Sequence, residues 1–107
     1  MDKAVQAELD MLKDIIVKTV PVEQIHLFGS YAQGVPHSDS DLDLYIVLKD
    51  NAEMRDIDAS LKIYRAIGGK KNMPVDILVS KQSAFTHRKN NPTLEQKIVK
   101  EGILVYG

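Results

Sequence analysis

Residues 28–47 read FGSYAQGVPHSDSDLDLYIV, and the organisation of the chain can be worked out from this stretch. Gly29 and Ser30 come directly after the apolar run QIHLF at 24–28, which is typical of a β-strand. The segment that follows is rich in Gly, Ser, Pro and Asp, which predicts a loop. The run LDLYIVL at 42–48 carries aliphatic side chains on both faces, which predicts a strand buried on both sides. The stretch therefore predicts a strand, a loop and a second strand.

The elements outside this unit follow from apolar spacing and from capping signals. Apolar side chains at intervals of three and four residues predict one long helix before the unit and one after it. Asp50 is the expected N-cap of the second of these helices. The expected elements are helices over 4–20, 51–67 and 94–101, and strands over 74–79 and 103–106. Their order predicts an α+β fold of α/β layers, with a mixed β-sheet flanked by helices.

Composition narrows the class of protein. The chain has 107 residues with a formal net charge of −1, so we expect residues 1–107 to form a single domain. It contains no cysteine, which excludes disulfides, thiol nucleophiles and thiolate metal sites. No apolar run approaches the length of a membrane span, and the first residues lack the apolar core of a signal peptide. A cytoplasmic protein is therefore expected.

Three acidic residues occur where a strand would normally be apolar. Asp41 and Asp43 are two positions apart at the start of a strand, so both carboxylates project to the same face. Such a pair is costly without a cation, and Mg²⁺ binds carboxylates together with waters and phosphates. Asp76 lies within the apolar run PVDILV and can join the pair if the two strands are neighbours. Three carboxylates could then hold two Mg²⁺ ions in the arrangement used for in-line phosphoryl or nucleotidyl transfer.

The spacing of these residues resembles the signature of a known enzyme superfamily. Gly29-Ser30, ten intervening residues and then Asp41-Leu42-Asp43 are similar to the GS-x10-D-x-D pattern of the nucleotidyltransferases related to polymerase β. The run PVDILV resembles the strand that carries the third carboxylate of this family. The resemblance covers roughly residues 24–80. It implies a nucleotidyltransferase fold like the palm of polymerase β.

The resemblance also implies roles for individual residues. Gly29 and Ser30 would hold the β- and γ-phosphates of a nucleoside triphosphate, with ATP as the expected donor. Asp41, Asp43 and Asp76 would bind two Mg²⁺ ions. Asp76 would also help to deprotonate the hydroxyl group of the acceptor. The expected reaction is the transfer of a nucleoside monophosphate, AMP if the donor is ATP, with the release of pyrophosphate.

The short chain favours the minimal nucleotidyltransferases within this superfamily, because larger members add a helical domain that binds the acceptor. Minimal members are typically encoded beside a small helical HEPN protein, which is an RNase toxin. The resemblance therefore implies an antitoxin of a type VII toxin–antitoxin system, which transfers AMP to a tyrosine of its HEPN partner. A homo- or hetero-oligomer is expected, with no membrane association.

Two other functions remain open from the sequence. The chain could neutralise a toxin by binding alone, or it could modify a small molecule such as an aminoglycoside. A nucleic acid is not the expected substrate, because there is no aromatic and basic surface of the kind that binds single strands. The acidic residues also have purely structural readings. Asp41 and Asp43 could lie in a solvated turn, Asp76 could face water on an edge strand, and Asp39 could be a loop acid or a further ligand.

Overall fold

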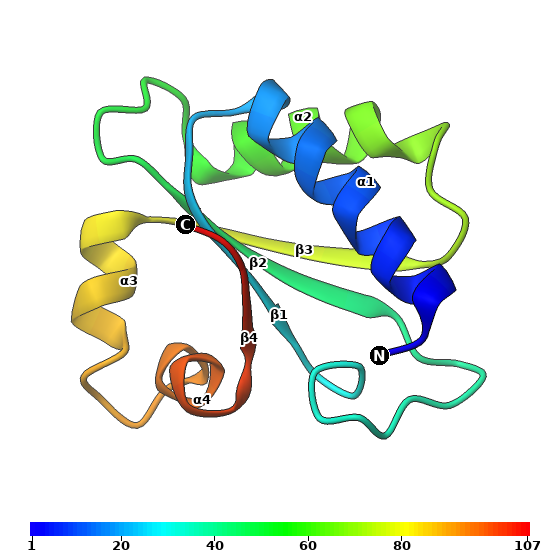
Figure 1. Ribbon diagram of the computed structural model, residues 1–107. Coiled ribbons are helices and arrows are strands. Elements are labelled where there is room, and N and C mark those ends of the chain that lie inside the picture. Colours follow the sequence, from blue (N-terminus) through cyan, green and yellow to red (C-terminus); the bar gives the residue numbers. More distant parts are fainter.

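The computed structural model describes residues 1–107 as one four-stranded sheet with four helices (Figure 1). The strands follow the order β3-β2-β1-β4; β2 and β3 are parallel, and β1 is antiparallel to β2 and to β4. The elements are α1 (Lys3–Thr19), β1 (Val22–Phe28), β2 (Leu42–Leu48), α2 (Asp56–Gly68), β3 (Val75–Lys81), α3 (Gln82–Arg88), α4 (Leu94–Glu101) and β4 (Ile103–Tyr106). The predicted α+β fold with a mixed sheet is confirmed. None of the helices combines the length and the apolar character that crossing a membrane requires.

Helices cover the sheet on both faces, with α1 and α2 on one side and α3 and α4 on the other (Figure 1). Both faces of the sheet carry apolar side chains that must be buried, as strand β2 shows. Its successive side chains point to opposite faces. Leu44 and Ile46 are fully buried in the larger core beneath α1 and α2. Tyr45 and Val47 point the other way and join Phe85 of α3 in a smaller core. The aliphatic run on both faces therefore marked a central strand, as predicted.

The predicted helix over 51–67 is wrong at its start, because α2 begins only at Asp56. The expected N-cap, Asp50, caps a different helix: its carboxylate accepts a hydrogen bond from the backbone N–H of Ser83 at 2.9 Å. Ser83 lies in the first turn of α3, a seven-residue helix that the sequence analysis did not predict. A helix this short shows no full apolar period, and its cap comes from a residue distant in the sequence.

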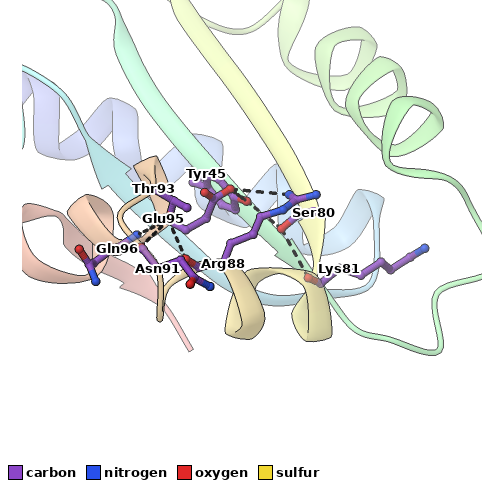
Figure 2. A network of polar contacts seen from close by, with 8 residues as sticks. All are labelled: Tyr45, Ser80, Lys81, Arg88, Asn91, Thr93, Glu95 and Gln96. Carbon is purple, nitrogen blue, oxygen red and sulfur yellow. Dashed lines mark hydrogen bonds and ion pairs between the residues drawn. The ribbon is translucent and has the colours of Figure 1, made fainter.

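A network of polar contacts connects α3 and α4 to the sheet (Figure 2). The Tyr45 hydroxyl lies 2.7 Å from Glu95 Oε2 and 2.8 Å from Ser80 Oγ. A carboxylate can only accept, so Tyr45 donates its single hydrogen to Glu95 and accepts from Ser80. Arg88 of α3 lies 3.7 Å from the same Glu95 oxygen. Burial, together with the bond donated to Glu95, raises the pKa of Tyr45 to about 12, so the hydroxyl remains a donor throughout the physiological range.

We expect Tyr45→Phe to lower the free energy of unfolding by about 1.5–3 kcal/mol, because the variant removes a buried hydrogen bond to a charged group. Thermal unfolding followed by circular dichroism measures this loss. Tyr106→Phe is the matched control, since the hydroxyl of the exposed Tyr106 makes no hydrogen bond in the structure, and it should melt like the wild type. Equal melting temperatures for the two variants would show that the network contributes nothing to stability.

Candidate active site

The topology of the sheet brings the predicted site residues together at one end of the sheet, where β1 ends and where β2 and β3 begin. Strand β1 is antiparallel to β2, and β2 is parallel to β3, so β1 ends at the same end of the sheet at which β2 and β3 begin. Phe28, the last residue of β1, pairs with Asp43. Asp43 in turn pairs with Asp76 of β3. The two carboxylates are therefore direct neighbours on adjacent strands, and the loop that starts at Gly29 runs past them.

Gly29 makes a close approach to Asp43 that no other residue type would allow. Its φ angle is +77°, in the left-handed region that side chains disfavour. A Cβ atom at Gly29 would also overlap the Oδ2 atom of Asp43. The glycine is thus required both by the backbone turn and by the space that the carboxylate occupies.

The loop between Gly29 and Asp41 is held closed by a buried serine, Ser40. The hydroxyl of Ser30 donates to Ser40 Oγ at 2.9 Å, and the backbone N–H of His37 donates to the same oxygen, also at 2.9 Å. Ser40 is 8% exposed, so this hydroxyl joins the two ends of the loop from inside. Ser40 lies within residues 24–80, which resemble the family, but no role was predicted for it. Its position three residues after His37, in a turn, was the available signal.

The carboxylates differ in their surroundings. Asp43 is half-buried, whereas Asp41 and Asp76 are exposed. Desolvation raises the pKa of Asp43 above its ordinary range, and the negative charges of Asp76 and Asp41 add to this effect. Ionisation of Asp43 is therefore less favourable in the folded protein than in a free aspartate, and a nearby cation would offset this cost.

The three carboxylates do not converge as closely as the sequence analysis expected. No group of three Asp, Glu, His or Cys side chains stands close enough together to hold a metal ion without rearrangement. The close pair is Asp43 and Asp76, and Asp41 lies one residue before β2. Repulsion between like charges opposes tighter packing of all three.

The donor chemistry of the site nevertheless suits Mg²⁺. Asp41, Asp43 and Asp76 offer only carboxylate oxygens, and the structure gives Asp41 and Asp43 no hydrogen-bond partner that would compete with a cation. Oxygen ligands, one or two carboxylates at a time, are what Mg²⁺ selects. Because Gly29 has no side chain, Oδ2 of Asp43 can occupy the place that a Cβ atom would otherwise fill.

Tyr64 of α2 is a further polar contact of the site that the sequence analysis missed. Its hydroxyl lies 3.2 Å from Asp76 Oδ1 and accepts a hydrogen bond from the backbone N–H of Ile77 at 2.8 Å. Burial raises the pKa of Tyr64 above its ordinary value. The apolar spacing of the helix marked Tyr64 only as a core residue, and the sequence has no local signal for a contact that spans twelve positions.

The cavity next to the site is small. A space of about 80 Å³ adjoins Gly29 and is lined by residues of β1 and α4, among them Phe28, Leu94 and Ile98. Pockets that enclose small-molecule ligands are typically about 300–1,000 Å³. None of the three carboxylates lines this cavity.

Comparisons with solved structures support the same fold. A toxin–antitoxin complex crystallised with AMP-PNP aligns with a TM-score of 0.67 and 22% identity, over 92% of this chain and 73% of that chain. A mutant of the MntA-HpeT toxin–antitoxin gives 0.66 and 21% over the same shares. A protein from Sulfolobus solfataricus, named as a candidate nucleotidyltransferase, gives 0.58 and 24% over 97% and 86%. No significant match was found among curated protein sequences.

A family model describes most of the chain. The model for "Polymerase beta, Nucleotidyltransferase" matches residues 10–107, which include the loop after β1, the carboxylates of β2 and β3 and the C-terminal helices. The resemblance noted in the sequence is thereby confirmed. With the strand order and the edge occupied by Gly29, Asp43 and Asp76, this match shows that the chain belongs to the polymerase β nucleotidyltransferase family.

Proposed function

We propose that the protein is a cytoplasmic, Mg²⁺-dependent nucleotidyltransferase that transfers AMP from ATP to a hydroxyl group of a partner protein. The observation that carries this proposal is the pairing of Asp43 with Asp76 across β2 and β3, with Gly29 folded against Asp43. Membership of the polymerase β nucleotidyltransferase family supports the reaction class. One neighbour in fold was crystallised with AMP-PNP, which is consistent with an adenine nucleotide as donor.

In this proposal each residue has a separate task. Asp41, Asp43 and Asp76 would hold two Mg²⁺ ions, which would supply positive charge to neutralise the triphosphate and polarise the phosphorus. Gly29 lets the backbone approach the β- and γ-phosphates, and Ser30 offers them its hydroxyl. The Ser30 hydroxyl donates its single hydrogen to Ser40 Oγ in the structure, so it turns from Ser40 to a phosphate oxygen when the nucleotide binds.

The reaction then needs one proton transfer. Asp76 is the exposed member of the close carboxylate pair, so it can reach an acceptor hydroxyl and draw its proton away. The acceptor oxygen attacks the α-phosphorus, a new P–O bond forms to AMP, and the bond to pyrophosphate breaks. The half-buried Asp43 stays with the donor side of the site.

The acceptor is proposed to be a tyrosine of a HEPN-type toxin, so that the protein acts as an antitoxin. Two observations support a protein acceptor rather than a small molecule. The site lies at one end of the sheet, where Asp41 and Asp76 are exposed, and the cavity next to Gly29 is only about 80 Å³. In addition, two of the neighbours in fold come from toxin–antitoxin complexes.

The test is a transfer assay with α-labelled ATP, Mg²⁺ and the HEPN-type protein encoded beside this chain. Label should appear on the partner, and Asp41→Ala/Asp43→Ala should reduce transfer at least about 100-fold, because loss of a metal ligand costs more than loss of a residue that merely supports one. The matched control is Asp56→Asn/Asp58→Asn, an acidic pair of the same spacing on α2, which should retain transfer.

Two results would reject the proposal. One is the absence of any transfer by the intact protein, and the other is undiminished transfer by Asp41→Ala/Asp43→Ala. If that double variant transferred nothing and still neutralised the toxin in cells, the protein would act on its partner by binding alone.

A further inference from the structure

The contact between Tyr64 and Asp76 suggests a specific role in the site. Among the three carboxylates, Asp76 alone has a hydrogen-bond partner, the Tyr64 hydroxyl, 3.2 Å from its Oδ1 atom. Asp76 is exposed on β3, which is an edge strand of the sheet. An exposed aspartate without a partner samples several rotamers, and binding a cation would require it to give up that freedom.

The hydroxyl of Tyr64 is itself held in place from two sides. The backbone N–H of Ile77, on the open edge of β3, donates to the Tyr64 oxygen at 2.8 Å. Since the oxygen accepts from Ile77, its hydrogen is free to be donated to Asp76 Oδ1. The ring of Tyr64 packs against the larger core, and α2 is anchored there by the buried Ile63 and Ile67. The donor to Asp76 is therefore fixed by the core and by the strand that carries Asp76.

We propose that Tyr64 is a positioning residue, which holds Oδ1 of Asp76 so that Oδ2 faces the neighbouring Asp43 and a divalent cation shared by the two carboxylates. This role rests on the proposed function, because it concerns the same metal site. Hydrogen bonds of this kind to ligating carboxylates orient them, and their loss typically weakens metal binding about 10- to 100-fold.

Binding of Mn²⁺ to the full chain tests the proposal without reliance on catalysis. Tyr64→Phe keeps the ring in the core and removes only the hydroxyl, so it should fold and should bind Mn²⁺ about 10-fold more weakly than the wild type. In an Asp76→Asn background the same change should have no further effect on Mn²⁺ affinity, because the carboxylate through which Tyr64 acts is absent. Titration of free Mn²⁺ by electron paramagnetic resonance measures all four proteins.

Tyr45→Phe is the matched control for a purely structural effect. It also removes a tyrosine hydroxyl bonded to a carboxylate, but that carboxylate is Glu95 of α4, which is not one of the three carboxylates of the site. Tyr45→Phe should therefore lower the melting temperature and leave Mn²⁺ affinity unchanged. Equal Mn²⁺ affinity of Tyr64→Phe and the wild type would overturn the role of Tyr64, as would an equal loss in the Asp76→Asn background.

The outcomes also separate this inference from the proposed function. If the wild type bound no Mn²⁺ and transferred no nucleotide, the proposed function would fail, and the role of Tyr64 would fail with it. If the wild type bound Mn²⁺ and transferred AMP while Tyr64→Phe did both equally well, only the role of Tyr64 would be rejected.

Discussion

Asp43→Asn is expected to unfold at a higher temperature than the wild type in metal-free buffer at pH 7, and to lose nucleotidyl transfer by at least about 100-fold. The gain in stability follows from the raised pKa of Asp43, because the folded protein keeps this group ionised at pH 7 against desolvation and against the charges of Asp76 and Asp41. Since Asp43 is only half-buried and solvent screens its charge, we expect a gain of about 0.5 kcal/mol, or roughly 2–4 °C.

The raised pKa of Asp43 also determines how the stability difference between the wild type and Asp43→Asn changes with pH. The folded pKa of Asp43 lies above the value of about 3.9 for a free aspartate, so the folded state binds the proton more tightly than the unfolded chain. The cost to the wild type is complete above the folded pKa and disappears as the pH falls toward and below the unfolded one. Melting curves of the wild type and Asp43→Asn should therefore converge below about pH 4.

Asp58→Asn provides a control of opposite sign. The side-chain hydrogen bond and the charge of Arg55 lower the pKa of Asp58, so removal of the Asp58 charge should decrease stability at pH 7 rather than increase it.

Added Mg²⁺ or Mn²⁺ should raise the melting temperature of the wild type and have little effect on Asp43→Asn. An Asp43→Asn variant that melted below the wild type without metal would contradict the electrostatic account of the site.

Gly29→Ala is expected to lose most nucleotidyl transfer while losing no more stability than a comparable change elsewhere in the loop. A left-handed φ angle costs an alanine roughly 1–2 kcal/mol. The added Cβ would collide with Oδ2 of Asp43, which is the far end of a flexible side chain. The carboxylate can turn away at little energetic cost, but it then leaves the position beside Asp76 that the proposed metal site needs.

Gly34→Ala isolates the second effect, since the structure offers a nearly identical backbone without the collision. Gly34 has a φ angle of +76°, against +77° for Gly29, and a Cβ there would meet nothing within 4 Å. The two variants should therefore show similar losses of stability in thermal melts. Only Gly29→Ala should bind Mn²⁺ more weakly, and its rate of nucleotidyl transfer should fall at least about 10-fold. This is the scale expected when a metal ligand is misplaced.

Full transfer by Gly29→Ala would mean that the space beside Asp43 is not needed for the reaction. A Gly34→Ala variant as inactive as Gly29→Ala would mean that the left-handed turns of the loop, rather than the position of the Asp43 carboxylate, limit activity.

Much of the fold could be predicted because its signals are local. The apolar run of β2 showed a central strand, and Thr93 indicated the start of α4, where its side chain accepts from Gln96 N at 3.2 Å. The start of α2 and the whole of α3 could not be predicted, because Asp50 caps α3 from 33 residues away in the sequence. Local capping rules assign such a residue to the nearest helix, and here the tertiary contact prevails.

The sequence by itself determined the class of fold and indicated the family, and it predicted the site residues, because the spacing of Gly29, Ser30, Asp41 and Asp43 is a property of the chain and needs no coordinates. Only the tertiary structure decided how those residues meet. The parallel pairing of β2 with β3 places Asp76 beside Asp43, the turn at Gly29 packs against one carboxylate, and the Tyr64 hydroxyl reaches the other. Strand register and contacts between distant segments arise from packing the whole core, and no local pattern encodes them.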